Sequence, residues 1–148
     1  MRVMVLIKAN ADSENGVLPK SDYIGKMMEF NEMLVNKGIM LAGDGLHPSS
    51  RAKRVRFEAG KKPVVIDGPF AETKELLAGF WIWKVDSMDE AVALVKQIPE
   101  PDISASPASA KSEIELRPLF DMEEFGENVT PEIRAKANEL DAKITGRG

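Results

Sequence analysis

Two side chains in this sequence have the chemistry to exchange protons with a bound molecule, His47 and Asp67. His47 is the only histidine among the 148 residues, and an imidazole can accept and release a proton near neutral pH. Asp67 follows the apolar run Val64-Val65-Ile66 and opens the tetrapeptide Asp67-Gly68-Pro69-Phe70. Together they would suit a lyase- or isomerase-type reaction on a small, polar acid, either cyclic or open-chain.

Both residues also have structural interpretations, which remain open. An aspartate before Gly-Pro can accept hydrogen bonds from nearby backbone N–H groups and so close a turn. His47 lies in a loop before Pro48, where it would be a solvated side chain without a chemical role. Asp44, three residues before His47, could orient the ring, although an odd spacing on a strand directs two side chains to opposite faces.

Several charged residues near these two, Asp44 among them, are candidate ligand contacts. Arg51 and Arg54 flank the glycine-rich turn, and their planar guanidinium groups could hold a carboxylate. The turn after the tetrapeptide carries Glu72, Lys74 and Glu75, which would form a rim over a ligand, with Lys74 on an anionic group. Both sets also have a structural interpretation. The arginines could simply form the solvated face of a strand, and Glu72, Lys74 and Glu75 could form a turn held by ion pairs.

Composition restricts the remaining chemistry. The chain has no cysteine and one histidine, which removes thiolate catalysis and the usual zinc sites. We expect no cofactor and no tightly bound metal, while a weak magnesium or calcium site through Asp44 and Asp67 stays open. A net charge of -4 without a basic stripe gives no support for a nucleic-acid partner.

The sequence also predicts a protein that does not associate with a membrane. No run of residues approaches the roughly 20 apolar positions that a membrane helix needs. The first ten residues lack the core and cleavage site of a signal peptide. We therefore expect a cytoplasmic location.

Hydrophobic periodicity predicts the elements that must position these side chains. Apolar spacing of three and four predicts a helix from Ser21 to Lys37, ended by Gly38, and a second helix that begins at Ser87, with Glu90 completing its cap. The expected strands cover residues 2–8, 39–48, 79–85 and 112–119, with a hairpin over residues 51–66 and a loop over residues 99–111. Thr130 and Pro131 start a last helix, which runs to Ile144.

This order predicts an α+β fold: a ferredoxin-like split β-α-β arrangement with an inserted hairpin and a C-terminal helix. We expect one domain over residues 1–120 and a helical extension over residues 121–148. The strand Gly79–Val85 has apolar side chains on both of its faces. One face packs against the helices, so the other must be covered by something else, and the sheet of a second subunit is the simplest candidate. A homodimer is therefore predicted.

The stretch "VVIDGPFAETKELLAGFWIWKV" resembles the signature of the DGPF-domain family of YCII-related proteins, and "GLHPSSRAKRVRF" and "EIELRPLF" are similar to its flanking segments. This resemblance implies a dimeric α+β barrel, in which two ferredoxin-like sheets pack face to face. Most members of the family have no assigned activity, and some occur beside sigma-factor genes. More distant relatives are lyase-like or dehydrochlorinase-like enzymes with a proposed histidine–aspartate pair, and here Asp67 is the motif aspartate.

Three functions follow from the sequence. The favoured one is a dimeric small-molecule binding or regulatory module, whose ligand is a small carboxylic acid. The alternative is the lyase- or isomerase-type enzyme with His47 and Asp67 as its acid–base pair. The third is an assembly module in which the polar turn serves the dimer interface.

Overall fold

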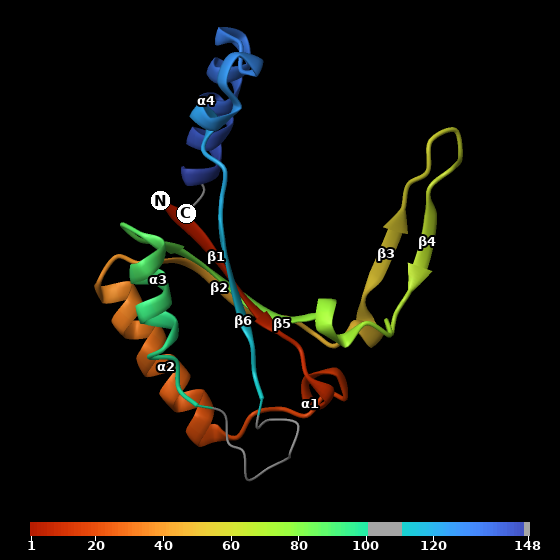
Figure 1. Ribbon diagram of the computed structural model, residues 1–148, viewed down its shortest axis with the longest axis vertical. Coiled ribbons are helices and arrows are strands. Elements are labelled where there is room, and N and C mark those ends of the chain that lie inside the picture. The colour runs from red at the N-terminus through yellow and green to blue at the C-terminus, as the bar shows by residue number, and fades with distance from the viewer. Residues whose placement is uncertain (101–110, 147–148) are drawn as a thin grey trace. The chain divides into compact units, whose positions relative to one another are not determined.

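The computed structural model describes residues 1–100 and 111–146 and contains a four-stranded antiparallel sheet (Figure 1). Its strands are β1 (Arg2–Lys8), β2 (Met40–Gly45), β5 (Leu77–Lys84) and β6 (Ile114–Pro118), in the spatial order β2-β5-β1-β6. The helices α2 (Ser21–Asn36) and α3 (Met88–Val95) lie on one side of the sheet. This is the predicted ferredoxin-like split β-α-β arrangement, and the α+β prediction is confirmed.

Local signals set the ends of the two helices. Helix α2 ends at Asn36, and Gly38 shortly beyond it has a φ of 69°, a left-handed conformation that favours glycine. At the start of α3, the Glu90 N–H donates to Ser87 Oγ at 3.1 Å. The Glu90 carboxylate accepts from the Asp86 N–H at 2.6 Å, one residue before the position that the capping pattern predicted.

The core lies between the helices and one face of the sheet. It contains Trp81 and Trp83 of β5, Phe30 and Leu34 of α2, and Val3 and Val5 of β1, together with Ala91 and Leu94 of α3. Burial of each large apolar side chain contributes about 1.5–3 kcal/mol. Trp81 Nε1 donates to Asn31 Oδ1 at 2.9 Å, so this buried indole keeps a hydrogen bond.

Within the unit Met1–Pro118, neither α2 nor α3 lies on the second face of the sheet. Phe80 and Ile82 are half-buried there, and their cross-strand partners on β1 are Leu6 and Met4. The predicted alternation along β5 is therefore confirmed: Trp81 and Trp83 face the helices, and Phe80 and Ile82 face away. We call Met4, Leu6, Phe80 and Ile82 the open sheet face. Its cover by a second subunit stays a prediction.

The predicted hairpin is present between β2 and β5. Strand β3 (Lys53–Arg56) pairs with β4 (Val64–Asp67) in a separate two-stranded sheet, with Val55 opposite Val65. Two short 3-10 helices flank the hairpin, η1 (Ser49–Arg51) before it and η2 (Thr73–Glu75) after it.

A short helix after β1 was not predicted, and neither were the 3-10 helices. Residues Ala11–Glu14 form this helix, α1, in a polar stretch for which no element was predicted. The Ser13 N–H donates to Asn10 Oδ1 at 2.9 Å, and the Asn10 N–H donates to Ser13 Oγ at 2.9 Å. This capping box forms the turn without any apolar periodicity. Most of the loop predicted over residues 99–111 lies outside the described residues.

The chain divides into two compact units, Met1–Pro118 and Leu119–Gly148. The second unit contains η4 (Met122–Asn128) and α4 (Pro131–Thr145), the predicted C-terminal helix. The Ile133 N–H donates to Thr130 Oγ1 at 3.3 Å, and Pro131 is the first helical residue, which confirms the predicted start. No side chain of α4 is buried. The proposed boundary between residues 120 and 121 remains a prediction.

Among the described helices, none has the length and apolar character to cross a membrane.

Candidate functional site

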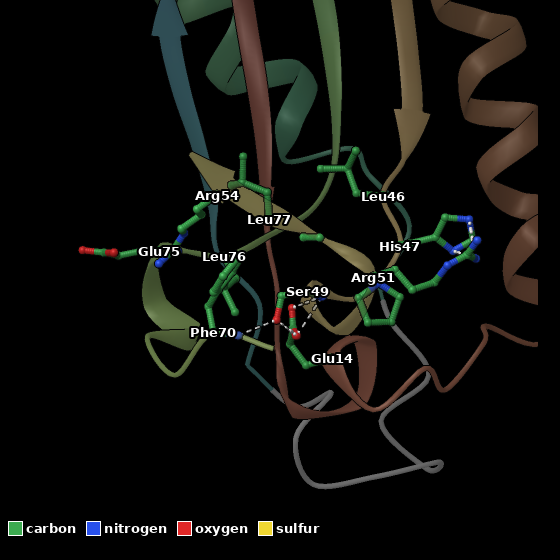
Figure 2. Close-up of a pocket in the computed structure, with 12 residues that line it drawn as sticks. Glu14, Leu46, His47, Ser49, Arg51, Arg54, Phe70, Glu75, Leu76 and Leu77 are labelled. Atoms are coloured by element: carbon green, nitrogen blue, oxygen red, sulfur yellow. Dashed lines mark hydrogen bonds between the residues drawn. The ribbon is translucent and has the colours of Figure 1, made fainter. Parts of the chain in front are cut away.

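A cavity of about 330 Å³ lies where β2, η1, the hairpin base and the start of β5 meet (Figure 2). Six side chains form its apolar part: Leu46, Pro48, Ala52, Phe70, Leu76 and Leu77. Its polar part consists of Glu14, His47, Ser49, Arg51, Arg54 and Glu75. The volume is within the usual range for a small-molecule site.

Ser49 fixes the loop that forms one wall of this cavity. Its side chain is only 5% exposed. Ser49 Oγ donates to Glu14 Oε2 at 2.7 Å, and the Ser49 N–H lies 3.1 Å from the same oxygen (Figure 2). Charge-assisted hydrogen bonds of this kind are among the strong ones, so α1 holds η1 in place through a single carboxylate.

The tetrapeptide turn is attached to the same serine. The Phe70 N–H donates to Ser49 Oγ at 3.1 Å, and the Gly68 N–H donates to the Ala52 carbonyl at 3.0 Å. The Gly68–Pro69 peptide bond is cis. A Cβ on Gly68 would lie 1.7 Å from the Ser49 carbonyl oxygen, so only glycine allows this close approach. The Gly-Pro-Phe part of the turn therefore has a structural role in the cavity wall.

Arg54 lies against the apolar part of the cavity. Its guanidinium carbon is 3.8 Å from the centroid of the Phe70 ring, which is a cation–π contact. One guanidinium nitrogen is 3.7 Å from a carboxylate oxygen of Glu72. Because these contacts hold the guanidinium group at the lining, Arg54 can offer a positive charge to a ligand without a large loss of side-chain entropy.

His47 and Arg51 lie side by side at one edge of the cavity (Figure 2). Arg51 Nη1 is 3.1 Å from Nδ1 and 3.0 Å from Nε2 of the His47 ring. The contact places a guanidinium group, which only donates hydrogen bonds, directly against the imidazole ring. The pair presents an acid–base group and a fixed positive charge next to each other.

Asp67 lies at the end of β4 and is not one of the lining residues. Its Oδ1 is 2.5 Å from Lys53 Nζ, and the Asp67 side chain is 71% exposed. The structure therefore does not bring Asp67 to the cavity edge where His47 lies. The acidic groups that line the cavity are Glu14 and Glu75.

The other predicted ligand residues are placed as follows. Arg51 and Arg54 line the cavity, and Glu72 contacts Arg54. Lys74, on η2, is exposed and outside the lining. Asp44 is exposed on β2 opposite Phe80, also outside the lining. No three or more histidine and acidic side chains gather as a cation site within residues 1–100 and 111–146.

Sequence reasoning missed Glu14 and Ser49. They are 35 residues apart, and no spacing rule relates an acidic residue in a polar stretch to a serine in a distant loop. The capping pattern of Asn10 and Ser13 was a usable signal for α1, since it predicts a turn that ends near Glu14.

Residues 1–120 match the sequence profile of the YCII-related domain. An uncharacterized protein of Rhizobium meliloti (strain 1021) is 39% identical over 74 residues, which are 50% of this chain and 54% of that protein. The chain thus matches about half the length of this curated relative.

A solved structure, 5-chloro-2-hydroxyhydroquinone dehydrochlorinase from Burkholderia phenoliruptrix AC1100 in complex with 2,5-dihydroxybenzoquinone, is also similar. It has 16% sequence identity and a TM-score of 0.42, and the match covers 82% of this chain and 96% of that one.

Proposed function

The chain belongs to the YCII-related domain family, and from this premise we propose that it is a homodimeric module that binds a small organic acid in the cavity beside Ser49. The tetrapeptide Asp67-Gly68-Pro69-Phe70 supports the further proposal that it falls in the DGPF subfamily.

The observation that carries this proposal is the pairing of positive charge with an apolar wall. Arg51 and Arg54 line the same cavity as Leu46, Leu76 and Leu77. An organic acid with a small hydrocarbon part satisfies both, because guanidinium groups bind carboxylates through two parallel hydrogen bonds and the hydrocarbon part gains from burial. Glu14 does not compete for these cations, since its carboxylate accepts from Ser49.

The homodimer is supported by the open sheet face. Met4, Phe80 and Ile82 are half-buried within one copy, and a contiguous apolar surface of this kind usually marks a contact between molecules. Two copies of this face, related by a two-fold axis, would cover each other. Sedimentation at micromolar concentration measures the mass, and a monomer would contradict the dimer.

Binding is tested with named probes, namely acetate, benzoate and cyclohexanecarboxylate. A ligand that binds only the folded state raises the melting temperature, and we expect the two ring-bearing acids to exceed acetate. Arg54→Ala should abolish the increase. Lys53→Ala is the matched control, because Lys53 belongs to the same strand but its contact is with Asp67 outside the lining. An equal response of both variants would remove the cavity assignment.

The second candidate function is the lyase- or isomerase-type enzyme. The contact of Arg51 with the His47 ring favours it, since it places a side chain capable of acid–base chemistry beside a positive charge that can hold an anionic substrate. Any acid that binds is then tested for turnover with the parent and with His47→Ala and Asp67→Asn. Turnover that needs His47 but not Asp67 would support a mechanism without the predicted pair, and turnover lost in both variants would support that pair. Binding without any turnover supports the binding module.

A further inference from the structure

The hairpin carries an exposed apolar face. Val55 and Val65 are opposite each other in the β3–β4 register, and Phe57 lies just beyond the end of β3. Their exposed fractions are 50%, 60% and 77%. We call these three residues the hairpin face. A two-stranded ribbon alone is marginally stable in water, so this ribbon needs a partner surface.

The hairpin is also basic. Residues 53–67 contain five basic side chains against two acidic ones, a net charge of +3. The basic residues are Lys53, Arg54, Arg56, Lys61 and Lys62, and the acidic ones are Glu58 and Asp67. The whole chain has a net charge of -4, so the hairpin differs in sign from the rest of the molecule. The partner surface should be acidic as well as apolar.

The segment Leu119–Asn128 has both properties. Phe120 and Phe125 are 70% and 45% exposed, and their rings pack with centroids 5.1 Å apart. The ten residues include four acidic side chains and no basic one, a net charge of -4. Asp121, Glu123, Glu124 and Glu127 are the acidic residues. Neither η4 nor the helix α4 that follows it has a buried residue, so the unit Leu119–Gly148 does not bury these aromatic side chains in a core of its own.

We propose that the hairpin face of one copy packs on the segment Leu119–Asn128 of a second copy. The proposal rests on the homodimer and not on the ligand cavity. In a two-fold dimer the contact is made twice, because each copy contributes one hairpin and one acidic segment. The opposite charges would favour this pairing over two hairpins together or two acidic segments together.

The chain contains no cysteine, so an introduced cysteine is the only thiol that a maleimide can modify. A tagged Ala59→Cys variant is mixed with an untagged Asn128→Cys variant, exchanged to equilibrium and treated with a short bis-maleimide. We expect a cross-linked product with the mass of two chains. Lys26→Cys mixed with Asn128→Cys is the control, since Lys26 is exposed on α2, and it should give no product.

Three outcomes overturn the proposal. A dimer in sedimentation with no cross-linking above the control removes the hairpin contact and leaves the homodimer. In a chain that carries both Ala59→Cys and Asn128→Cys, cross-linking only within one chain places the contact inside a copy. A monomeric parent removes the contact and the homodimer together, whereas acid binding by the cavity is measured separately.

Dissociation constants of the dimer give an independent measurement. Phe57→Ser should weaken the dimer roughly tenfold or more, since a truncated aromatic anchor has effects of this size. Arg56→Glu and Glu127→Arg should each weaken it, and the double variant should recover affinity. Tryptophan fluorescence checks folding, because Trp81 and Trp83 belong to the buried core and the substituted residues do not. An unchanged constant for Phe57→Ser, or no recovery in the double variant, would contradict the contact.

Discussion

The carboxylate of Glu14 accepts hydrogen bonds from both the backbone N–H and the hydroxyl of Ser49, 35 residues further along the chain. The same hydroxyl accepts from the Phe70 N–H. Three separate segments therefore meet at one buried oxygen atom, and these segments form one wall of the cavity. The shape of the cavity depends on two residues that do not need to touch a ligand.

Removal of the Ser49 hydroxyl should destabilise the fold. In Ser49→Ala, the Phe70 N–H loses its acceptor and the Glu14 carboxylate loses a donor, which costs about 1–3 kcal/mol in the free energy of unfolding. Urea unfolding followed by tryptophan fluorescence measures this quantity. Ser50→Ala is the matched control, because Ser50 is exposed and should change little. Equal stability of the two variants would show that Ser49 is not the joint between the three segments.

Two glycine substitutions should have opposite effects. Gly68→Ala should be strongly destabilising, since the added Cβ would lie 1.7 Å from the Ser49 carbonyl oxygen. Gly25→Ala should stabilise by about 0.5–1 kcal/mol, because Gly25 is inside α2 with nothing within 4 Å of an added Cβ and alanine is the better helix former. Thermal unfolding of both variants tests the pair. Tolerance of Gly68→Ala would contradict the close approach of the turn.

Tyr23 should ionise at unusually high pH. Burial raises the pKa of its phenol above the ordinary value of 10.0, because desolvation disfavours the charged form. The folded state then holds the proton more tightly than the unfolded state, so stability is intact below pH 10 and falls as the pH rises towards the folded pKa. Tyr23 is the only tyrosine, so phenolate absorbance reports it alone. A midpoint of 10 in the folded protein would contradict the prediction.

Glu139 should titrate below its ordinary value. The hydrogen bond from Lys143, at 2.5 Å, is the main cause that lowers its pKa from 4.5, and the one from Lys136, at 3.1 Å, is the second. Lys143→Ala should therefore raise the pKa more than Lys136→Ala does, as measured by NMR of the carboxyl carbon. The contribution to helix stability is present above pH 4.5 and is lost as the pH falls through the lowered pKa. The reverse order of the two lysine variants would contradict this.

The sheet, its two large helices and the C-terminal helix could be predicted because each has a local signature. The capping residues Ser87 and Thr130 and the stop at Gly38 act within a few residues of sequence. The alternation along β5 likewise separated Trp81 and Trp83 from Phe80 and Ile82. These features are properties of short segments, so periodicity and capping rules are sufficient to find them.

The candidate site was only partly predictable, because its residues come from segments that are far apart in the sequence. Arg51, Arg54 and His47 were recognisable by residue type, and all three line the cavity. The assignment of Asp67 as the partner of His47 relied on chemistry without geometry, and in the structure Asp67 has Lys53 as its cross-strand partner. Glu14 could not be found, because its role exists only once α1 and η1 meet in three dimensions.

Strands β2 and β5 are neighbours in the sheet, and their pairing continues to the point where the Leu46 N–H donates to the Ala78 carbonyl at 2.8 Å. The segment between these two residues contains the hairpin and most of the cavity lining. Its two ends therefore lie next to each other, at the same end of the β2–β5 pair. A tight β-turn could in principle close the sheet there without this segment. The intervening residues therefore form a replaceable insertion. Related chains could differ in this insertion, and so bind a different ligand or partner, without any change to the four-stranded sheet and its helices.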